Sequence, residues 1–358
     1  MIDPAEIRDV AIVLPDMIGT TVCAMPAVHA IYSAFPAATI QLFGFEPTSR
    51  FLSDEPRVGQ DLVLLDLAQL RQQLAHLASP PDLAFDMLGT PESLGALARL
   101  RVRHVVGWPD REGHVTVPVP FPAGKHQLAV QDYLDFVLAV GAPAPFSPPR
   151  LTASADARER AAAWLAERGV REGETTFVLG VGGGNDRKRW PLDRYLELER
   201  QLAPRGRSIY FLGPREPELV ARLQQPARLI AASLPLDLAK GIVAGARLAV
   251  CNDHAMMHVA AALGVPTIGV FLASDPVEWF PYPPPSRHVV GPPLSCRPCY
   301  TESCDHWSCN DPALPARVHA LVEELLERFF TRRRRAPGGS RRSSRAGRGT
   351  GPAPAPGW

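Results

Sequence analysis

No apolar run in this sequence reaches the roughly 20 residues that a membrane-spanning helix needs. The first 16 residues also lack the pattern of a secretory signal, because acidic residues stand where such a signal is basic. Both absences favour a cytoplasmic protein. The 358 residues exceed the usual span of one domain, and 46% hydrophobic residues are enough for two sizeable cores.

Acidic residues are also absent from residues 332–358, which carry eight arginines. Since the whole chain sums to +1, residues 1–331 carry −7. The segment is rich in Gly, Pro and Ser and contains no Val, Leu or Ile, so a disordered basic tail is expected. Such a tail could approach anionic lipid or nucleic acid, but a solvated tail is the simpler interpretation, and no nucleic-acid partner is expected.

Short apolar strands alternate with helices along the rest of the chain, which is typical of a parallel sheet covered by helices. The Pro-rich segment Gly141–Arg150 is a candidate linker between two such series. The first series has strands at Val10–Leu14, Thr39–Phe43, Asp61–Leu65 and Leu83–Asp86, and helices over residues 22–34 and 91–100. The second has strands at Thr176–Gly180, Ser208–Leu212, Leu248–Cys251 and Thr267–Phe271, and helices near residues 154–168 and 316–330.

This order predicts an α/β protein with two doubly wound, Rossmann-like domains, residues 1–150 and 151–331, that face a cleft. Ligands are expected at the carboxyl ends of the strands.

A carboxylate follows one of these strands directly. Leu248–Cys251 ends in Asn252 and Asp253, and a helix begins at once with Asp253 as its predicted N-cap. Such a carboxylate beside free helix N–H groups can hold a sugar and a diphosphate together. His258 lies one turn inside and could reach the same anion. The alternative is an ordinary capped helix with a packed histidine.

A glycine-rich stretch, GVGGGNDRKRWP at residues 180–191, follows another strand. Its glycines permit close approach of the backbone to phosphate, while Lys188 and the neighbouring arginines supply positive charge for a diphosphate. An ordinary turn would explain such a loop about as well.

Several ordered motifs carry a family resemblance. Lys188-Arg189-Trp190-Pro191 is similar to a K-x-W-P signature, and Asp253, Ala255, His258 and Ala260 fall on a D-x-G-x-x-H-x-A motif, with Ala255 where glycine is usual. Further matches are Leu272–Pro276 to G-P-T-D-P, Ile18-Gly19 with Pro26-Ala27-Val28 to I-G-D-x-x-x-x-x-P-A-L, and Phe85–Gly89 to a strand ending in D-x-x-G. Over about residues 10–330 the chain thus resembles glycosyltransferase family 9, which contains the lipopolysaccharide heptosyltransferases.

The resemblance implies a GT-B fold with the nucleotide sugar in the C-terminal domain and the acceptor in the N-terminal domain. It implies that Lys188 contacts the diphosphate, that Gly183 and Gly184 line the nucleotide loop, and that Glu216 holds the ribose hydroxyls. It further implies that Asp253 binds the sugar, while the backbone of His254 and Ala255 and the side chain of His258 meet the phosphates. A solvated acid at a helix start is the alternative for Glu216.

One position departs from the family pattern. Family members carry aspartate directly after Ile18-Gly19 as the base that deprotonates the acceptor, whereas this chain has Thr20. A neutral threonine cannot act as a general base near pH 7. Asp16, four residues earlier, could reach the acceptor from the same turn, or it could only shape that turn.

The resemblance implies inverting transfer of a heptose or related sugar, with ADP-heptose as the expected donor and a lipopolysaccharide core or other surface glycan as the acceptor. No cofactor is expected to be required, since the nucleotide region has no D-x-D pair. Peripheral contact with the cytoplasmic face of the inner membrane is compatible with such an acceptor. Two alternatives remain: a catalytically impaired relative that binds a nucleotide sugar or serves as a scaffold, favoured by Thr20, and, more weakly, a nucleotide-sugar epimerase.

Four cysteines form a separate cluster. Cys296, Cys299, Cys304 and Cys309 have the spacing C-x₂-C-x₄-C-x₄-C, similar to a cluster near the C-terminus of many family 9 proteins. Four thiols could hold structural zinc or an iron–sulfur cluster. Free or locally packed thiols are the alternative, because the spacing lacks the second C-x₂-C of a zinc ribbon.

Overall fold

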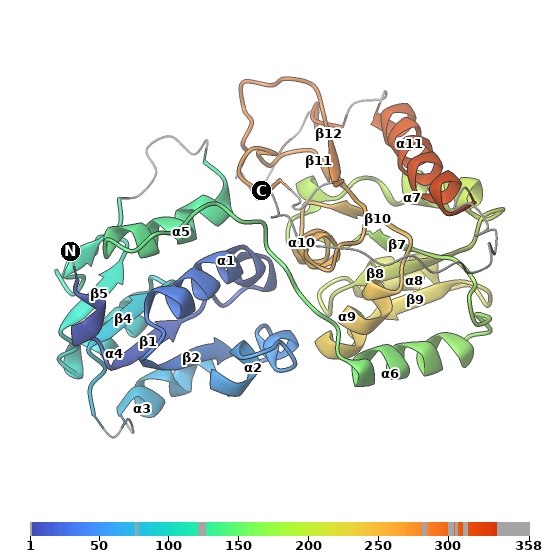
Figure 1. Ribbon diagram of the computed structural model, residues 1–358. Helices are drawn as coiled ribbons and strands as arrows, with labels where there is room; N and C mark the ends of the chain where they lie inside the picture. Colours follow the sequence, from blue (N-terminus) through green and yellow to red (C-terminus); the bar gives the residue numbers. More distant parts are fainter. Residues whose placement is uncertain are drawn as a thin grey trace, which may run out of the picture.

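Two six-stranded parallel sheets, each covered by helices, lie side by side in the computed structural model (Figure 1). The structure describes residues 2–75, 77, 79–120, 127–280, 285–299, 304, 307–310 and 314–334. Most of the predicted basic tail, residues 335–358, lies outside the described residues. The prediction of an α/β fold with two Rossmann-like domains is confirmed.

The first sheet has the strand order β3-β2-β1-β4-β5-β6. Its strands are β1 (Asp9–Val13), β2 (Thr39–Phe45), β3 (Leu62–Leu65), β4 (Leu83–Asp86), β5 (His104–Gly107) and β6 (Val117–Pro118). The helices of this half are α1 (Ile18–Ala34), α2 (Val58–Asp61), α3 (Leu70–Ala75), α4 (Pro91–Arg99) and α5 (Ala129–Ala139), with short 3₁₀ turns η1 (Pro4–Glu6), η2 (Arg50–Leu52) and η3 (Leu67–Gln69).

The second sheet has the order β12-β11-β10-β7-β8-β9. Its strands are β7 (Thr176–Gly180), β8 (Arg207–Leu212), β9 (Leu229–Ala232), β10 (Leu248–Asn252), β11 (Thr267–Phe271) and β12 (Arg287–Val290). The helices are α6 (Ala155–Ala166), α7 (Leu192–Leu202), α8 (Pro217–Leu223), α9 (Leu236–Ala244), α10 (Ala255–Ala262) and α11 (Leu314–Arg334), with the 3₁₀ turn η4 (Asp186–Lys188).

Both sheets therefore share one topology, in which the strand order reverses between two central neighbours. These neighbours are β1 and β4 in the first sheet and β7 and β10 in the second. In open α/β sheets ligands bind outside the carboxyl ends of the strands at this reversal. The loop at residues 180–191 and the segment Asn252–Ala255 both leave the second sheet there.

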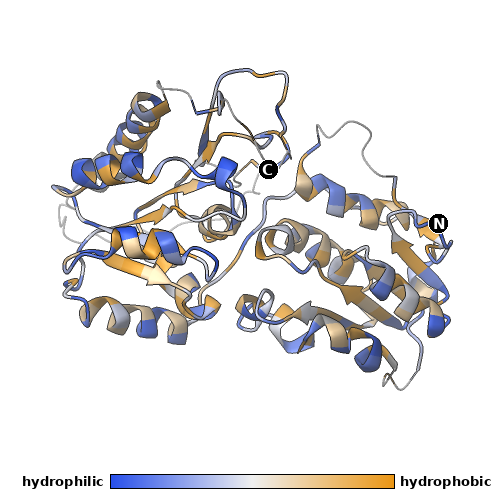
Figure 2. Cartoon of the chain, turned by 180° about the vertical axis from the view of Figure 1, so that it is seen from behind, coloured by the Kyte–Doolittle hydropathy of each residue, from blue (hydrophilic) through white to orange (hydrophobic). Residues whose placement is uncertain are grey.

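Apolar side chains explain why each element stays in place. The central strands β7 and β11 are buried along their whole length, as expected for a parallel sheet covered on both faces. Figure 2 shows both sheets largely in hydrophobic colours, while the covering helices are mixed. On α11, Leu314, Val318 and Leu325 are buried against the second sheet, and the helix extends three residues past the predicted boundary at 331.

Helices from the two halves pack directly on one another. α1 of the first half contacts α10 of the second, and Val259 and Ala262 of α10 are buried in the hydrophobic cluster of the first half. The approach is close at Gly19, where a Cβ atom would lie 3.3 Å from His258 Cδ2. A larger residue at Gly19 would therefore push α1 away from α10.

A buried ion cluster also joins the halves. Lys240 of α9 is fully buried, and its Nζ donates to the carbonyl of Phe51 (2.6 Å), to Glu55 Oε1 (3.0 Å) and to Asp54. The same two acids accept hydrogen bonds from the chain that crosses between the halves, at Thr152 and Ser154. Lys240 thus ties the two halves together, and its two acid partners hold the crossing segment.

The crossing segment runs from the end of α5 to α6 without regular structure, as the predicted linker Gly141–Arg150 requires (Figure 1). Among the described helices, none combines the length and apolar character needed to cross a lipid bilayer.

Candidate functional site

Asn252, the last residue of β10, organises the edge of the second sheet. Its side chain is fully buried, and Oδ1 accepts hydrogen bonds from the Trp190 N–H (2.9 Å) and the Tyr195 hydroxyl (2.8 Å). Its Nδ2 donates to the carbonyls of Val181 (3.0 Å) and Gly182 (2.9 Å). All these bonds hold the glycine-rich loop against the start of α7. The sequence interpretation assigned Asn252 no role, although an amide that closes an apolar strand was a usable signal.

Lys188 and Asp253 form an ion pair beside this loop, with Nζ 2.7 Å from Oδ2. The Asp253 side chain is only 3% exposed, whereas that of Lys188 is 28% exposed. An ammonium group has three donors, so Lys188 can bind a further anion while it contacts Asp253. The two residues that the sequence placed on a diphosphate and a sugar therefore meet at one point.

Glu216 is buried and connects two loops. Its Oε1 accepts from the Gly183 N–H (3.2 Å) and its Oε2 from the Gly213 N–H (2.7 Å), while Arg189 lies 3.6 Å away. The alternative of a solvated acid is therefore wrong. A Cβ atom at Gly182 would come within 3.2 Å of the Glu216 carboxylate, which explains why the loop needs glycine there.

The predicted N-cap of α10 is wrong by one residue. His254, not Asp253, caps the helix: its Nδ1 accepts from the Met256 N–H (3.2 Å) and its Nε2 donates to the Gly180 carbonyl (3.1 Å). This pattern requires a neutral ring protonated at Nε2, and burial accordingly lowers the pKa of His254. The Asp253 carboxylate does not cap the helix and instead pairs with Lys188.

His258 lies where α10 meets α1. Its Nδ1 is 3.8 Å from Cys23 Sγ, and its ring packs edge-on against Trp279 at 6.0 Å between centroids. Burial lowers the pKa of His258 to about 4, so the ring is neutral at pH 7. A neutral imidazole can donate a hydrogen bond to an anion but adds no charge.

The turn after β1 belongs to the other half and meets the start of α10 at Gly19, close to Ala255. Thr20 donates its hydroxyl to the Met17 carbonyl (2.9 Å) and also hydrogen-bonds with Tyr133 of α5. Asp16 is exposed at the beginning of the same turn. The structure thus brings the predicted acceptor turn next to the predicted donor helix, but it leaves Thr20 as a neutral, bonded hydroxyl.

Comparison with known proteins agrees with this geometry. The family model "Glycosyltransferase family 9 (heptosyltransferase)" matches residues 75–308. The chain belongs to glycosyltransferase family 9. Lipopolysaccharide heptosyltransferase 2 of Escherichia coli (strain K12) is 34% identical over 110 residues, which cover 28% of this chain and 30% of that protein. The match thus spans about a third of that relative's length.

Solved structures of glycosyltransferases share the fold. The E. coli ADP-heptose lps heptosyltransferase II aligns with a TM-score of 0.75 at 20% identity, covering 90% of this chain and 99% of that chain. The iron-containing dodecameric glycosyltransferase TibC from enterotoxigenic E. coli aligns with a TM-score of 0.59 at 11% identity, covering 90% and 77%. The two-domain GT-B prediction is therefore confirmed as a fold.

The cysteine cluster of this family 9 chain is anchored to the end of β11, since the Cys299 N–H donates to the Ala273 carbonyl at 2.8 Å. Cys309 is buried and Cys296 is exposed. Burial raises the pKa of Cys309, Arg297 opposes this effect, and the nearby thiols of Cys304 and Cys299 raise the pKa further. The Cys304 and Cys299 thiols thus act electrostatically on Cys309, but the group of ligand atoms found within 4.8 Å of one another among the described residues contains none of the four cysteines.

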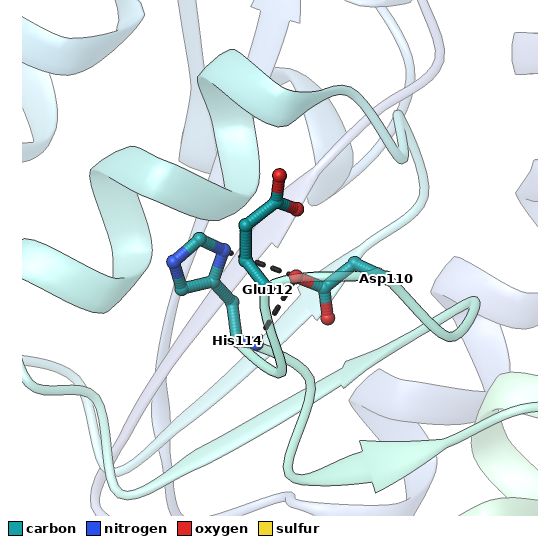
Figure 3. Close-up of side chains that lie close together, drawn as sticks. All are labelled: Asp110, Glu112 and His114. Atoms are coloured by element: carbon teal, nitrogen blue, oxygen red, sulfur yellow. Dashed lines mark hydrogen bonds and ion pairs between the residues drawn. The ribbon is translucent and has the colours of Figure 1, made fainter.

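A second group of side chains that could bind a metal lies in the loop between β5 and β6 of the first sheet (Figure 3). Asp110, Glu112 and His114 offer ligand atoms within 4.8 Å of one another. The backbone N–H groups of His114 and Val115 already bind the Asp110 carboxylate at 3.1 and 3.0 Å, and Glu112 is exposed. These bonds explain the cluster as a stabilised turn.

Proposed function

We propose that this chain transfers a heptose or related sugar from a nucleotide donor, with ADP-heptose the first candidate, to a surface glycan such as a lipopolysaccharide core. The observation that carries the proposal is the contact between Lys188 and Asp253 at the reversal point of the second sheet. Family membership and the names of the relatives support the reaction class and the donor.

In this proposal residues 151–331 bind the donor and residues 1–150 the acceptor. Lys188 moves from Asp253 to the diphosphate, and Gly183, Gly184 and the backbone at His254 and Ala255 line the nucleotide. The Glu216 carboxylate accepts hydrogen bonds from two backbone N–H groups. Its remaining lone pairs can accept hydrogen bonds from the ribose hydroxyls. Asp253, released by Lys188, accepts hydrogen bonds from the sugar, while His258 reaches the phosphates as a neutral donor.

The transfer would proceed with inversion. An acceptor oxygen attacks the anomeric carbon as the bond to the diphosphate breaks, and the electron pair leaves with the diphosphate. Lys188 and the N-terminus of α10 stabilise that developing charge. The interface between α1 and α10 brings acceptor and donor together, because the turn at Gly19 touches Ala255.

A lipid-linked acceptor would bring the protein to a membrane surface. We infer peripheral contact at the cytoplasmic face from the lipopolysaccharide named in its relatives.

Isothermal titration against ADP, UDP, GDP and their sugar conjugates tests the donor. We expect selective binding of the ADP sugar, and selectivity for UDP or GDP would keep the transferase but change its donor. Binding of a nucleotide sugar without any release of the nucleotide would favour the second candidate, an impaired binding protein, for which Thr20 is the supporting observation. No binding at all would contradict both candidates.

We also propose that Cys296, Cys299, Cys304 and Cys309 bind one structural metal ion or iron–sulfur cluster. The spacing of the four cysteines and the iron-containing neighbour support this. The purified protein should contain about one zinc, or iron in cluster stoichiometry, per chain by elemental analysis. Cys299→Ser should lose the metal, whereas Cys251→Ala, in the core, should keep it. Metal-free protein with reactive thiols would contradict the proposal.

A further inference from the structure

The proposed transfer requires a group that removes the acceptor proton, and the expected position cannot supply it. Thr20 is neutral and already bonded to the Met17 carbonyl and to Tyr133. The base must therefore be another side chain near the same turn. A carboxylate with a free oxygen is the type of group required.

Asp132 occupies the first turn of α5, directly before Tyr133, the partner of Thr20. This turn meets the second half of the molecule, since the Ala129 N–H donates to the Glu278 carbonyl at 2.9 Å. α5 also packs along α1, the helix that carries Thr20. Asp132 therefore lies where the predicted acceptor turn and the donor half come together.

The thiol of Cys23 on α1 is influenced by the charges of both Asp132 and the predicted donor site. After burial, the charges of Asp253, Asp132 and Glu278 are what raise the pKa of this thiol. Cys23 also contacts His258 of α10. Asp253 from one half and Asp132 from the other thus both act on the charge of the same buried sulfur.

We propose that Asp132 is the general base of this transferase. As the acceptor oxygen attacks the anomeric carbon, its proton passes to Asp132 Oδ2, the bond between the anomeric carbon and the diphosphate breaks, and the electron pair leaves with the diphosphate. This assignment rests on the proposed function.

The surroundings of Asp132 suit that role. The Gln127 Nε2 donates to Oδ1 at 3.0 Å, and Oδ2 has no hydrogen-bond partner among the described residues. Burial raises the pKa of Asp132 to about 6; Gln127 opposes the shift, and the charges of Glu278 and Asp135 add to it. Such a carboxylate is ionised at pH 7 yet more basic than an ordinary aspartate.

Asp132→Asn tests the base, with water as the acceptor because the natural acceptor is unidentified. The readout is the release of ADP from ADP-heptose. We expect kcat to fall about 10²- to 10⁴-fold, the usual contribution of a general base, while the Kd for ADP-heptose is unchanged. The matched control is Asp135→Asn, one turn further along, whose carboxylate accepts from the same Gln127 at 2.8 Å. It should keep kcat at pH 8, where Asp132 is ionised in either protein, and shift the acidic limb to lower pH because its charge no longer raises the Asp132 pKa.

A structural role would not change the pH profile, so the profile is the second readout. In the wild type kcat should fall as the pH drops through about 6, because Asp132 becomes protonated. This acidic limb should disappear in Asp132→Asn. Adding Thr20→Asp to that variant restores the family carboxylate and should recover part of the lost rate.

Two results would overturn the assignment. An unchanged kcat and an intact acidic limb in Asp132→Asn would remove Asp132 as the base, and loss of both in Asp16→Asn instead would assign the role to Asp16. Failure of the proposed function looks different: the wild type would bind ADP-heptose but release no ADP at any pH.

Discussion

Replacing Lys240 by methionine should lower the free energy of unfolding by about 3–5 kcal/mol, the usual cost of removing one partner from a buried ion pair. The methionine fills similar volume but leaves Glu55, which is 7% exposed, and Asp54 without their cation. Thr152 and Ser154 still donate to the two acids, but neutral donors compensate only part of the charge. Urea unfolding followed by circular dichroism measures the loss.

Arg160→Met is the matched control, because Arg160 on α6 pairs with Asp237 on α9 at the surface. Exposed pairs contribute little, so this variant should unfold near the wild type. Adding Asp54→Asn and Glu55→Gln to Lys240→Met should recover stability, since the stranded charges are then gone. A Lys240→Met protein as stable as the Arg160→Met protein would show that the cluster does not hold the halves together.

The same cluster gives the protein a defined sensitivity to acid. Burial alone would raise the pKa of Asp54, but the hydrogen bond and charge of Lys240 hold it below its usual value. A carboxylate with a lowered pKa stabilises the fold above its unfolded pKa of about 3.9, and that stabilisation is lost as the pH falls through the folded value. The Lys240→Met protein should lack this contribution.

Lys188→Ala should weaken the binding of both ADP and the ADP sugar about 10- to 100-fold, because a charge-assisted hydrogen bond of roughly 1.5–3 kcal/mol is lost. Lys188 is the ammonium group at the predicted diphosphate position and is exposed enough to reach it. Titration calorimetry with the two ligands measures the effect. Arg194→Ala, an exposed arginine on α7 paired with Glu197, controls for the loss of one positive charge.

Asp253→Ala should act differently. Its carboxylate neutralises Lys188 in the free protein, so its removal should leave ADP affinity unchanged or higher. Affinity for the ADP sugar should fall relative to ADP, because the hydrogen bonds from the sugar are lost. Equal losses of ADP affinity in the two variants would contradict this division between diphosphate and sugar.

The sequence predicted those parts of the fold whose cause is local. β4, β7 and β11 have the predicted bounds, because strands buried on both faces are built around apolar runs. The strands β5, β6, β9 and β12 were not predicted; they lie at or next to the edges of the two sheets, where the apolar pattern is weaker. Their pairing comes from the sheet beside them.

Within the site, the sequence named Lys188, Asp253 and Glu216 but not what holds them. The bonds of Asn252 reach residues more than 50 positions away, and Lys240 meets Glu55 across 185 positions. No local periodicity reports such contacts. The choice of His254 over Asp253 as the cap was equally hidden, because it depends on the Gly180 carbonyl that fixes the histidine ring.

The segment that crosses between the halves could be cut without separating them. Its last residues are bound on both sides: the Leu151 N–H donates to the Ala262 carbonyl, and Thr152 and Ser154 bind Glu55 and Asp54. Residues 145–147, by contrast, are exposed. A nick in the backbone there would cut the chain without cutting these bonds, so the two fragments would stay assembled as one particle.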